Sequence, residues 1–66
     1  MELIKRLAEV RKEKGLSQER LAELSGVCRV TIARIEAGKF FPSVRTLKKL
    51  CGALDVPVGE LIEKAG

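Results

Sequence analysis

The sequence predicts an all-α fold in which five short helices form a single compact domain over residues 1–66. With 66 residues, the chain is long enough for one domain and no more. Leu, Ile, Val and Ala dominate its apolar residues and Lys, Glu and Arg its charged ones, a mixture that favours helices over strands. In addition, apolar residues recur at spacings of three and four along most of the chain, as they do on the buried face of a helix.

Two helices are predicted in the first part of the chain. The first covers residues 2–14 and ends at Gly15, since glycine commonly follows the last turn of a helix. Its apolar stripe consists of Leu3, Ile4, Leu7, Ala8 and Val10. The second covers residues 18–24, and Ser17 can cap its first turn by accepting a backbone N–H. The side chains expected to point inward from it are Leu21, Ala22 and Leu24.

A tight turn and a third helix follow. Gly26 suits a turn position with a positive φ angle. The third helix covers residues 29–37, with Ile32 and Ile35 facing inward. Two helices this short, joined by so tight a turn, usually cross at a steep angle, which is the helix-turn-helix arrangement. The outward face of the third helix then carries Arg29, Val30, Ala33 and Arg34.

Two further helices complete the predicted bundle. Pro42 makes residues 39–42 a loop, because proline disfavours helical geometry in the residue before it. The fourth helix runs from an N-cap at Ser43 to Leu54. Its apolar positions are Val44, Leu47, Leu50, Cys51 and Leu54. The fifth helix covers residues 58–64, with Leu61 and Ile62 as its apolar positions.

The positive charge of the chain is concentrated in its middle third. Residues 29–49 carry six basic side chains against one acidic side chain, a net charge of +5, whereas residues 1–28 carry +1 and residues 50–66 carry −2. Such a concentration is expected of a surface that contacts a polyanion, although a solvated charged face is the alternative.

The residue inventory excludes several classes of function. The chain has no histidine, no CxxC pair, no paired carboxylates on one predicted helix face and no glycine-rich phosphate loop, so neither an enzyme, a metal site nor a cofactor is predicted. Cys28 and Cys51 are expected to be free thiols, with a disulfide or redox switch as the alternative. The charged N-terminus is neither a signal peptide nor a membrane span, which predicts a cytoplasmic protein.

Several short motifs keep a joint spacing along the chain. They are Gly15-Leu16-Ser17-Gln18, Leu21-Ala22-Glu23, Gly26-Val27, Ile32-Ala33-Arg34-Ile35-Glu36, Gly38-Lys39 and Pro42-Ser43. Over residues 3–63 the chain resembles the lambda-repressor and Cro-type (XRE-like) helix-turn-helix family of bacterial and phage transcriptional regulators. The resemblance implies a sequence-specific, double-stranded DNA-binding regulator, most simply a repressor, that binds as a homodimer to a near-palindromic operator.

The resemblance makes residues 29–37 the recognition helix, which enters the major groove. The residues that it implies for reading bases are Arg29, Val30, Ala33 and Arg34. Arginine can bond guanine O6 and N7 together, whereas Val30 and Ala33 offer apolar contact, for instance to a thymine methyl group. A phosphate contact is the alternative for Arg29, and a phosphate contact or a pair with Glu36 is the alternative for Arg34.

Further roles follow from the same resemblance. The phosphate-binding candidates are Ser17, Gln18, Cys28 and Lys39. Ser17 is equally explained as a helix cap, and Cys28 stands where the family usually has Ser or Thr, whose hydroxyl is a better acceptor than a thiol. Arg11 and Glu36 match a family pair that bridges the first and third helices, and we interpret this pair as structural.

Two aromatic residues depart from the family pattern. Phe40 and Phe41 occupy loop positions that are usually polar, and at least one of them is expected at the surface, where we favour a dimer contact over a DNA contact. The family often dimerises around its fifth helix, which adds four candidates: Val56, Pro57, Val58 and Leu61. Leu61 is equally explained as a core residue.

A second class of function stays open alongside DNA binding. The same fold serves as a protein-interaction module and as an antitoxin whose main partner is a toxin. Arginines on the outward face of the third helix favour DNA, because a pure interaction module would be expected to carry apolar residues there.

Overall fold

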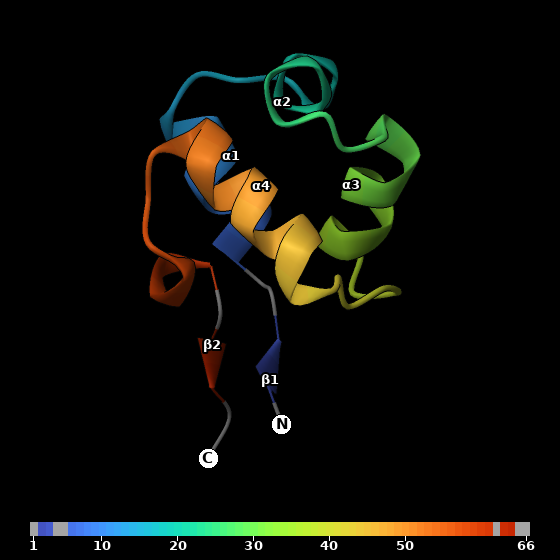
Figure 1. The fold of residues 1–66 in the computed structure, drawn as a ribbon, viewed down its shortest axis with the longest axis vertical. Coiled ribbons are helices and arrows are strands. Elements are labelled where there is room, and N and C mark those ends of the chain that lie inside the picture. Colours follow the sequence, from blue (N-terminus) through green and yellow to red (C-terminus); the bar gives the residue numbers. More distant parts are fainter. Residues whose placement is uncertain (1, 4–5, 62, 65–66) are drawn as a thin grey trace.

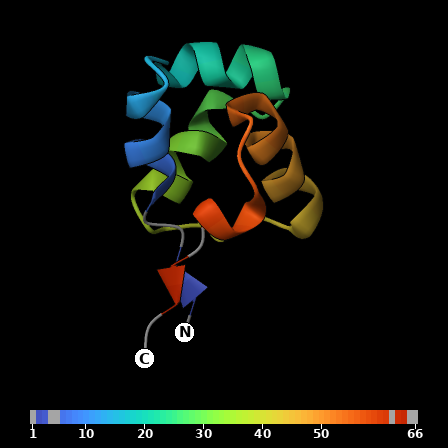
Figure 2. The ribbon, with the colours of Figure 1, turned by 90° about the vertical axis from the view of Figure 1, so that its left-hand side faces the viewer.

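Four α-helices and one short 3₁₀ helix surround a single core in the computed structural model, which describes residues 2–3, 6–61 and 63–64 (Figure 1). The α-helices are α1 (Arg6–Glu13), α2 (Gln18–Ser25), α3 (Arg29–Glu36) and α4 (Val44–Leu54), and the 3₁₀ helix is η1 (Val58–Glu60). Two short strands, β1 (Glu2–Leu3) and β2 (Glu63–Lys64), form an antiparallel pair in which Glu2 faces Lys64 and Leu3 faces Glu63. Figures 1 and 2 both show α2 across one end of the molecule and the strand pair at the opposite end.

The predicted fifth helix is wrong. One turn of 3₁₀ helix follows Pro57, and the chain then enters β2. Gly59 lowers the helix propensity of this segment, and within residues 58–61 only Leu61 is fully buried, so a longer helix here would have little apolar surface to bury. The predicted first helix also begins too early, because Glu2 and Leu3 lie in β1 and α1 starts at Arg6. Ile4 and Ile62 lie outside the described residues.

The core draws side chains from all four α-helices. Its buried residues are Leu7, Val10, Leu21, Val27, Ile32, Ile35, Leu47, Leu50, Cys51, Leu54 and Leu61. The prediction that Leu24 points inward is wrong, since its side chain is 47% exposed. The buried side of α2 is centred between Leu21 and Ala22, and Leu24 falls beyond its edge at about 100° of rotation per residue. Val44, in the first turn of α4, is also exposed.

The turn between α2 and α3 agrees with the prediction. Gly26 has a φ angle of 75°, and its N–H donates to the carbonyl oxygen of Ala22, which ends α2. A side chain at this position would meet no atom within 4 Å, so the requirement for glycine comes from the backbone conformation itself. Val27 is then buried and anchors the chain before α3 begins. Within residues 6–61, no helix is both long and apolar enough to cross a membrane.

Both predicted N-caps, at Ser17 and Ser43, are made by the serine side chains. Ser17 Oγ accepts from the N–H of Arg20 at 3.0 Å, and Ser43 Oγ accepts from the N–H of Thr46 at 3.2 Å. Cys28 occupies the N-cap position of α3 and makes no side-chain capping bond. The helix that carries the outward arginines therefore starts with its first-turn N–H groups uncapped by a side chain.

We expect Cys28→Ser to raise the free energy of unfolding by about 0.5–1 kcal/mol, because a serine hydroxyl can accept the N–H of Thr31. Urea unfolding followed by circular dichroism measures this change. Cys51→Ser is the matched control, since Cys51 is buried and a buried hydroxyl without a partner lowers stability. Equal or lower stability of Cys28→Ser would show that the α3 N-terminus gains nothing from a hydroxyl cap.

Candidate nucleic-acid interface

The outward face of α3 forms an open hollow together with the segment that follows it. The residues that line this hollow are Arg29, Val30, Ala33, Arg34, Ala37 and Lys39. The structure thus brings together the four residues predicted to read bases and one residue predicted to bind phosphate. Ala37 was missed, although its distances of seven and four positions from Val30 and Ala33 place it on the same helix face. We call this surface the α3 hollow.

The polar groups of the α3 hollow are available to a ligand. Arg29, Arg34 and Lys39 are exposed, and Val30 is 53% exposed. Within residues 6–61, neither arginine forms an ion pair, and Arg34 does not pair with Glu36. On the opposite side of the helix Ile32 and Ile35 are completely or almost completely buried, which fixes the rotation of α3 about its axis. The cationic and aliphatic groups are therefore exposed to solvent on a helix whose rotation about its axis is fixed by core packing.

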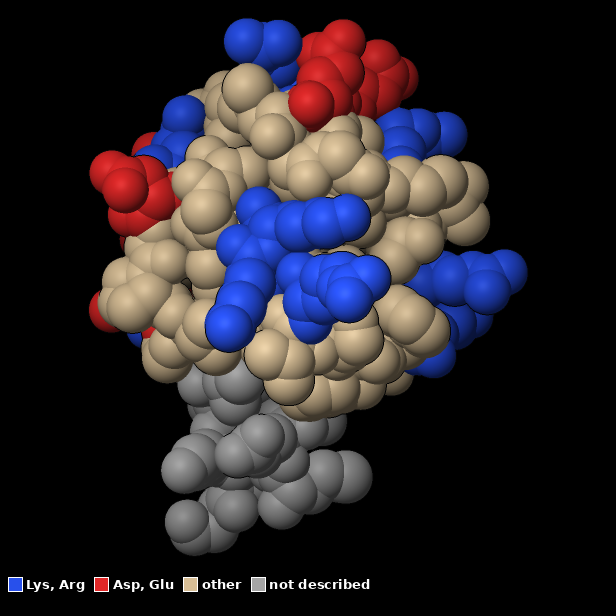
Figure 3. Space-filling model, viewed as in Figure 1, with Lys and Arg blue, Asp and Glu red and all other residues tan. Residues whose placement is uncertain are grey.

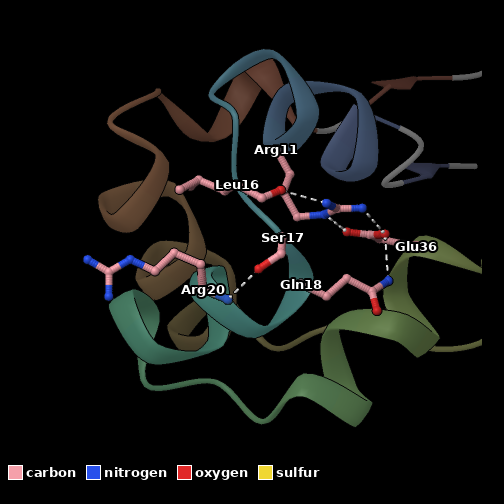
Figure 4. A network of polar contacts seen from close by, with 6 residues as sticks. All are labelled: Arg11, Leu16, Ser17, Gln18, Arg20 and Glu36. Carbon is pink, nitrogen blue, oxygen red and sulfur yellow. Dashed lines mark hydrogen bonds and ion pairs between the residues drawn. The ribbon is translucent and has the colours of Figure 1, made fainter.

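A buried ion pair holds α3 against α1 (Figure 4). Arg11 donates from Nε to Glu36 Oε2 at 2.7 Å and from Nη2 to Glu36 Oε1 at 3.1 Å. Its Nη1 donates to the carbonyl oxygen of Leu16 at 2.7 Å. Gln18 Nε2 donates to Glu36 Oε1 at 2.9 Å. This network, which we call the Glu36 network, joins α1, the start of α2 and the end of α3.

Both members of the pair stay charged in this environment. Burial by itself would raise the pKa of Glu36, but the hydrogen bonds from Arg11 and Gln18 and the positive charge of Arg11 bring that pKa below its ordinary value. The hydrogen bond to Glu36 raises the pKa of Arg11. The side chains are only 10% and 8% exposed, so the pair is shielded from solvent screening.

The lowered pKa of Glu36 predicts a stability that falls in acid. The pKa of Glu36 is lower in the folded protein than in the unfolded chain. The ion pair therefore stabilises the fold fully at pH values above the pKa of the unfolded chain, and this stabilisation is lost as the pH falls through the pKa of the folded protein. Thermal unfolding between neutral pH and pH about 3 measures the effect. The unfolding temperature of Glu36→Gln should depend less on pH than that of the wild type. The unfolding temperature of Glu23→Gln, a change at an exposed position, should depend on pH as it does in the wild type. Parallel curves for all three proteins would contradict the prediction.

The remaining phosphate candidates lie at the starts of two helices. Ser17 uses its hydroxyl to cap α2, and Gln18 uses one N–H of its amide in the Glu36 network, which leaves the second amide N–H to donate elsewhere. Cys28 is exposed at the start of α3. Both cysteines are free thiols, and burial raises the pKa of Cys51.

The candidates for a dimer interface do not all remain available. Phe40 and Phe41 are 46% and 51% exposed, Pro57 is exposed, and Val56 and Val58 are half-buried. Leu61 is 0% exposed and belongs to the core, which corrects its place among the interface candidates. A residue that the fold has already buried has no surface left for a partner.

A second basic surface lies on α4 and was not assigned a role from the sequence. Val44, Arg45, Lys48 and Lys49 line a shallow hollow there. Figure 3 shows Lys and Arg side chains gathered over the face that α4 presents in this view. The spacing of Arg45, Lys48 and Lys49 at three and four positions gives the signal for one helix face. Among residues 6–61 no three side chains of the metal-ligating types lie together.

Comparison with known protein families decides how this geometry is classified. A family model described as helix-turn-helix matches residues 7–61, which include all of α1 but its first residue, together with α2, α3, α4 and η1. The chain belongs to the helix-turn-helix family. The family model therefore covers the Glu36 network and the α3 hollow of this helix-turn-helix protein in full.

Curated relatives of this helix-turn-helix protein are regulators. It is 42% identical over 60 residues to the HTH-type transcriptional regulator PuuR of Escherichia coli (strain K12), a match that covers 91% of the chain and 32% of PuuR. It is 37% identical over 57 residues to the immunity repressor protein of Bacillus phage phi105, a match that covers 86% of the chain and 40% of the repressor. The chain thus spans less than half the length of these two relatives.

A solved structure has the same fold as this helix-turn-helix protein. The restriction-modification controller protein C.AhdI from Aeromonas hydrophila superposes with a TM-score of 0.82 and is 46% identical in sequence. The match covers 86% of each chain. The predicted resemblance to the lambda-repressor and Cro-type family is confirmed by these matches.

Proposed function

We propose that residues 1–66 form a single helix-turn-helix domain that binds double-stranded DNA in a sequence-specific manner and regulates transcription. The observation that carries the proposal is the α3 hollow, in which two arginines that form no ion pair within residues 6–61 flank an exposed aliphatic surface on one helix. Major-groove edges of base pairs offer the acceptors and methyl groups that such a surface can bind. The names of the relatives, which include transcriptional regulators and a repressor, support the same role.

The proposed complex places α3 in the major groove. Arg29 and Arg34 donate to guanine, and Lys39 contacts a phosphate at the edge of the α3 hollow. Gln18 donates its second amide N–H to another phosphate while its first stays bonded to Glu36. Occupancy of the operator is sufficient to block polymerase, so repression is the simplest outcome. The role is one of binding rather than catalysis, and a DNA target implies a cytoplasmic location.

Fluorescence anisotropy with duplexes that tile the region upstream of the gene tests the proposal. We expect one tile to bind tightly at physiological salt while a scrambled duplex does not. The Arg29→Ala/Arg34→Ala variant should lose this preference. Its matched control is Arg45→Ala/Lys48→Ala, which removes the same amount of charge from α4. Equal, salt-sensitive binding to every tile would contradict sequence-specific recognition.

The α4 surface favours a second candidate function, the binding of a protein partner such as the toxin of an antitoxin pair. Three basic side chains and the exposed Val44 would suit an acidic protein segment with an apolar residue. The same pair of variants separates the two functions. A partner that is lost with the α4 variant and kept with the α3 variant would favour the interaction module.

A homodimer is part of the proposal, and Phe40 and Phe41 are its leading contacts. Two copies of α3 would then enter successive major grooves about 34 Å apart on a near-palindromic operator. Val56, Pro57 and Val58 remain secondary candidates, since they keep part of their surface exposed. Phe40 and Phe41 are each about half exposed, and burying their aromatic surface in a dimer contact would be favourable.

We expect Phe41→Ala to shift the monomer–dimer equilibrium toward the monomer by about 1–3 kcal/mol, the effect of truncating a large aromatic contact. Sedimentation velocity over a range of protein concentrations measures the shift. Leu24→Ala is the matched control, because Leu24 is similarly exposed but lies on α2. An unchanged sedimentation profile for Phe41→Ala would remove this residue from the interface.

A further inference from the structure

The α3 hollow has a pattern of side chains that goes beyond a generally basic surface. At about 100° of rotation per residue, Arg29 and Arg34 are about 140° apart around the helix axis. Between them lie Ala33 at about 40°, Ala37 at about 80° and Val30 at about 100° from the first arginine. All five residues line the same hollow. Its centre is therefore a strip without polar side-chain atoms, and an arginine lies at each edge of it.

The spacing along the helix axis matches that of base pairs. Arg29 and Arg34 are five residues apart, which corresponds to about 7.5 Å along α3. Base pairs are spaced about 3.4 Å apart along the duplex, so with α3 placed parallel to the stack of base edges the two arginines are separated by about two base-pair steps. One base pair then faces the aliphatic strip between the two pairs that the arginines contact.

The chemistry of the strip selects among the four base pairs. Val30, Ala33 and Ala37 have no side-chain donor or acceptor, so a major-groove hydrogen-bonding group buried against them loses its water without replacement. Cytosine N4, adenine N6 and N7, guanine O6 and N7, and thymine O4 would all suffer this loss where they face the strip, so the polar groups alone do not separate the four base pairs. Thymine alone presents a methyl group at this edge, which gains from burial against aliphatic side chains.

We infer that each half-site of the DNA target contains a T·A pair, read through its 5-methyl group, between two G·C pairs read by Arg29 and Arg34. This inference rests on the proposed function and names the sequence class that the α3 hollow recognises. The exposed part of Val30 supplies most of the aliphatic surface, because it is the largest side chain of the strip. Val30 is thus a specificity-determining residue even though it cannot form a hydrogen bond to a base.

The test begins with selection of binding sites from a random duplex pool by the full chain. We expect the enriched half-site to contain a thymine between two guanines, which can be on either strand. Deoxyuridine is then placed at that thymine, since it removes the methyl group and nothing else. Binding should weaken about fourfold per half-site, the loss expected for one buried methyl group. 7-Deazaguanine at each flanking guanine should weaken binding as well, because it removes the N7 acceptor.

Protein variants assign the effect to the strip. With Val30→Ala the deoxyuridine penalty should shrink, whereas Leu24→Ala, an exposed aliphatic change on α2, should keep the full penalty. An enriched site without a central thymine, or one that tolerates deoxyuridine without loss, overturns the inference and leaves sequence-specific binding intact. A pool that yields no enriched sequence overturns the proposed function itself. The two failures are therefore distinguishable.

Discussion

Replacing Glu36 with glutamine is expected to lower the free energy of unfolding by about 3–5 kcal/mol, the cost of leaving one member of a buried ion pair without its partner. Arg11 is 10% exposed and directs two of its N–H groups at the Glu36 carboxylate. Glutamine replaces one of the two carboxylate oxygens with an NH2 group, which is itself a donor and cannot accept the bond that Arg11 directs at that position. A domain of 66 residues has about 3–10 kcal/mol of stability in total, so this variant should lose a large share of its stability.

Denaturant titration measures this loss of stability, and an exposed ion pair of the same chain provides the control. Arg20 and Glu23 form an ion pair on α2 in which both side chains are more than half exposed. Glu23→Gln should change stability by less than about 0.5 kcal/mol, because solvent screens that pair. A double variant in which Arg11 and Glu36 both become methionine should recover part of the loss, since it leaves no buried charge. Equal effects of Glu36→Gln and Glu23→Gln would show that burial contributes nothing to the pair.

Replacing Arg29 with alanine is expected to weaken binding to the selected DNA site by about 1–3 kcal/mol per half-site and to relax the preference at one base position. A dimer bound to both half-sites would lose this energy twice, so the total loss is about 2–6 kcal/mol. Arg29 is exposed and forms no ion pair within residues 6–61, so the stability of the fold should change by less than about 0.5 kcal/mol.

Binding to sites that carry each of the four bases at every position measures the change in preference. Lys39→Ala is the matched control, because a lysine that contacts phosphate should lose affinity equally for all sequences and reduce the salt slope by about one. If Arg29→Ala behaves in the same uniform way as Lys39→Ala, Arg29 is a phosphate contact and does not read a base.

The four α-helices could be predicted from the sequence because each has a local signal. Ser17 and Ser43 occupy N-cap positions, Gly26 has the positive φ angle that its turn requires, and each helix carries its own apolar stripe. The ends of the chain lacked such signals. The pairing of β1 with β2 joins residues about sixty positions apart, and two-residue strands leave no periodicity to detect.

The candidate site was predictable to a similar extent. The outward positions of α3 followed from the positions of Ile32 and Ile35, since residues on one face of a helix define the other. Ala37 was missed because small apolar residues near a helix end carry no chemical signal of their own. Gln18 was predicted to contact phosphate, yet its bond to Glu36 depends on how α2 crosses α3, which no sequence pattern specifies.

The division of α3 into two faces has a consequence for how relatives of this protein diverge. Ile32, Ile35 and Glu36 hold the helix in place, whereas the outward side chains of Arg29, Val30, Ala33 and Arg34 form no hydrogen bond or ion pair with the rest of residues 6–61. Substitutions on the outward face are therefore nearly neutral for stability. Substitutions there can change which operator sequence is bound without a compensating change elsewhere in the domain. The outward residues of one regulator can likewise be introduced into a homologous one. A lineage can thus acquire a new target gene at little risk of losing the folded protein.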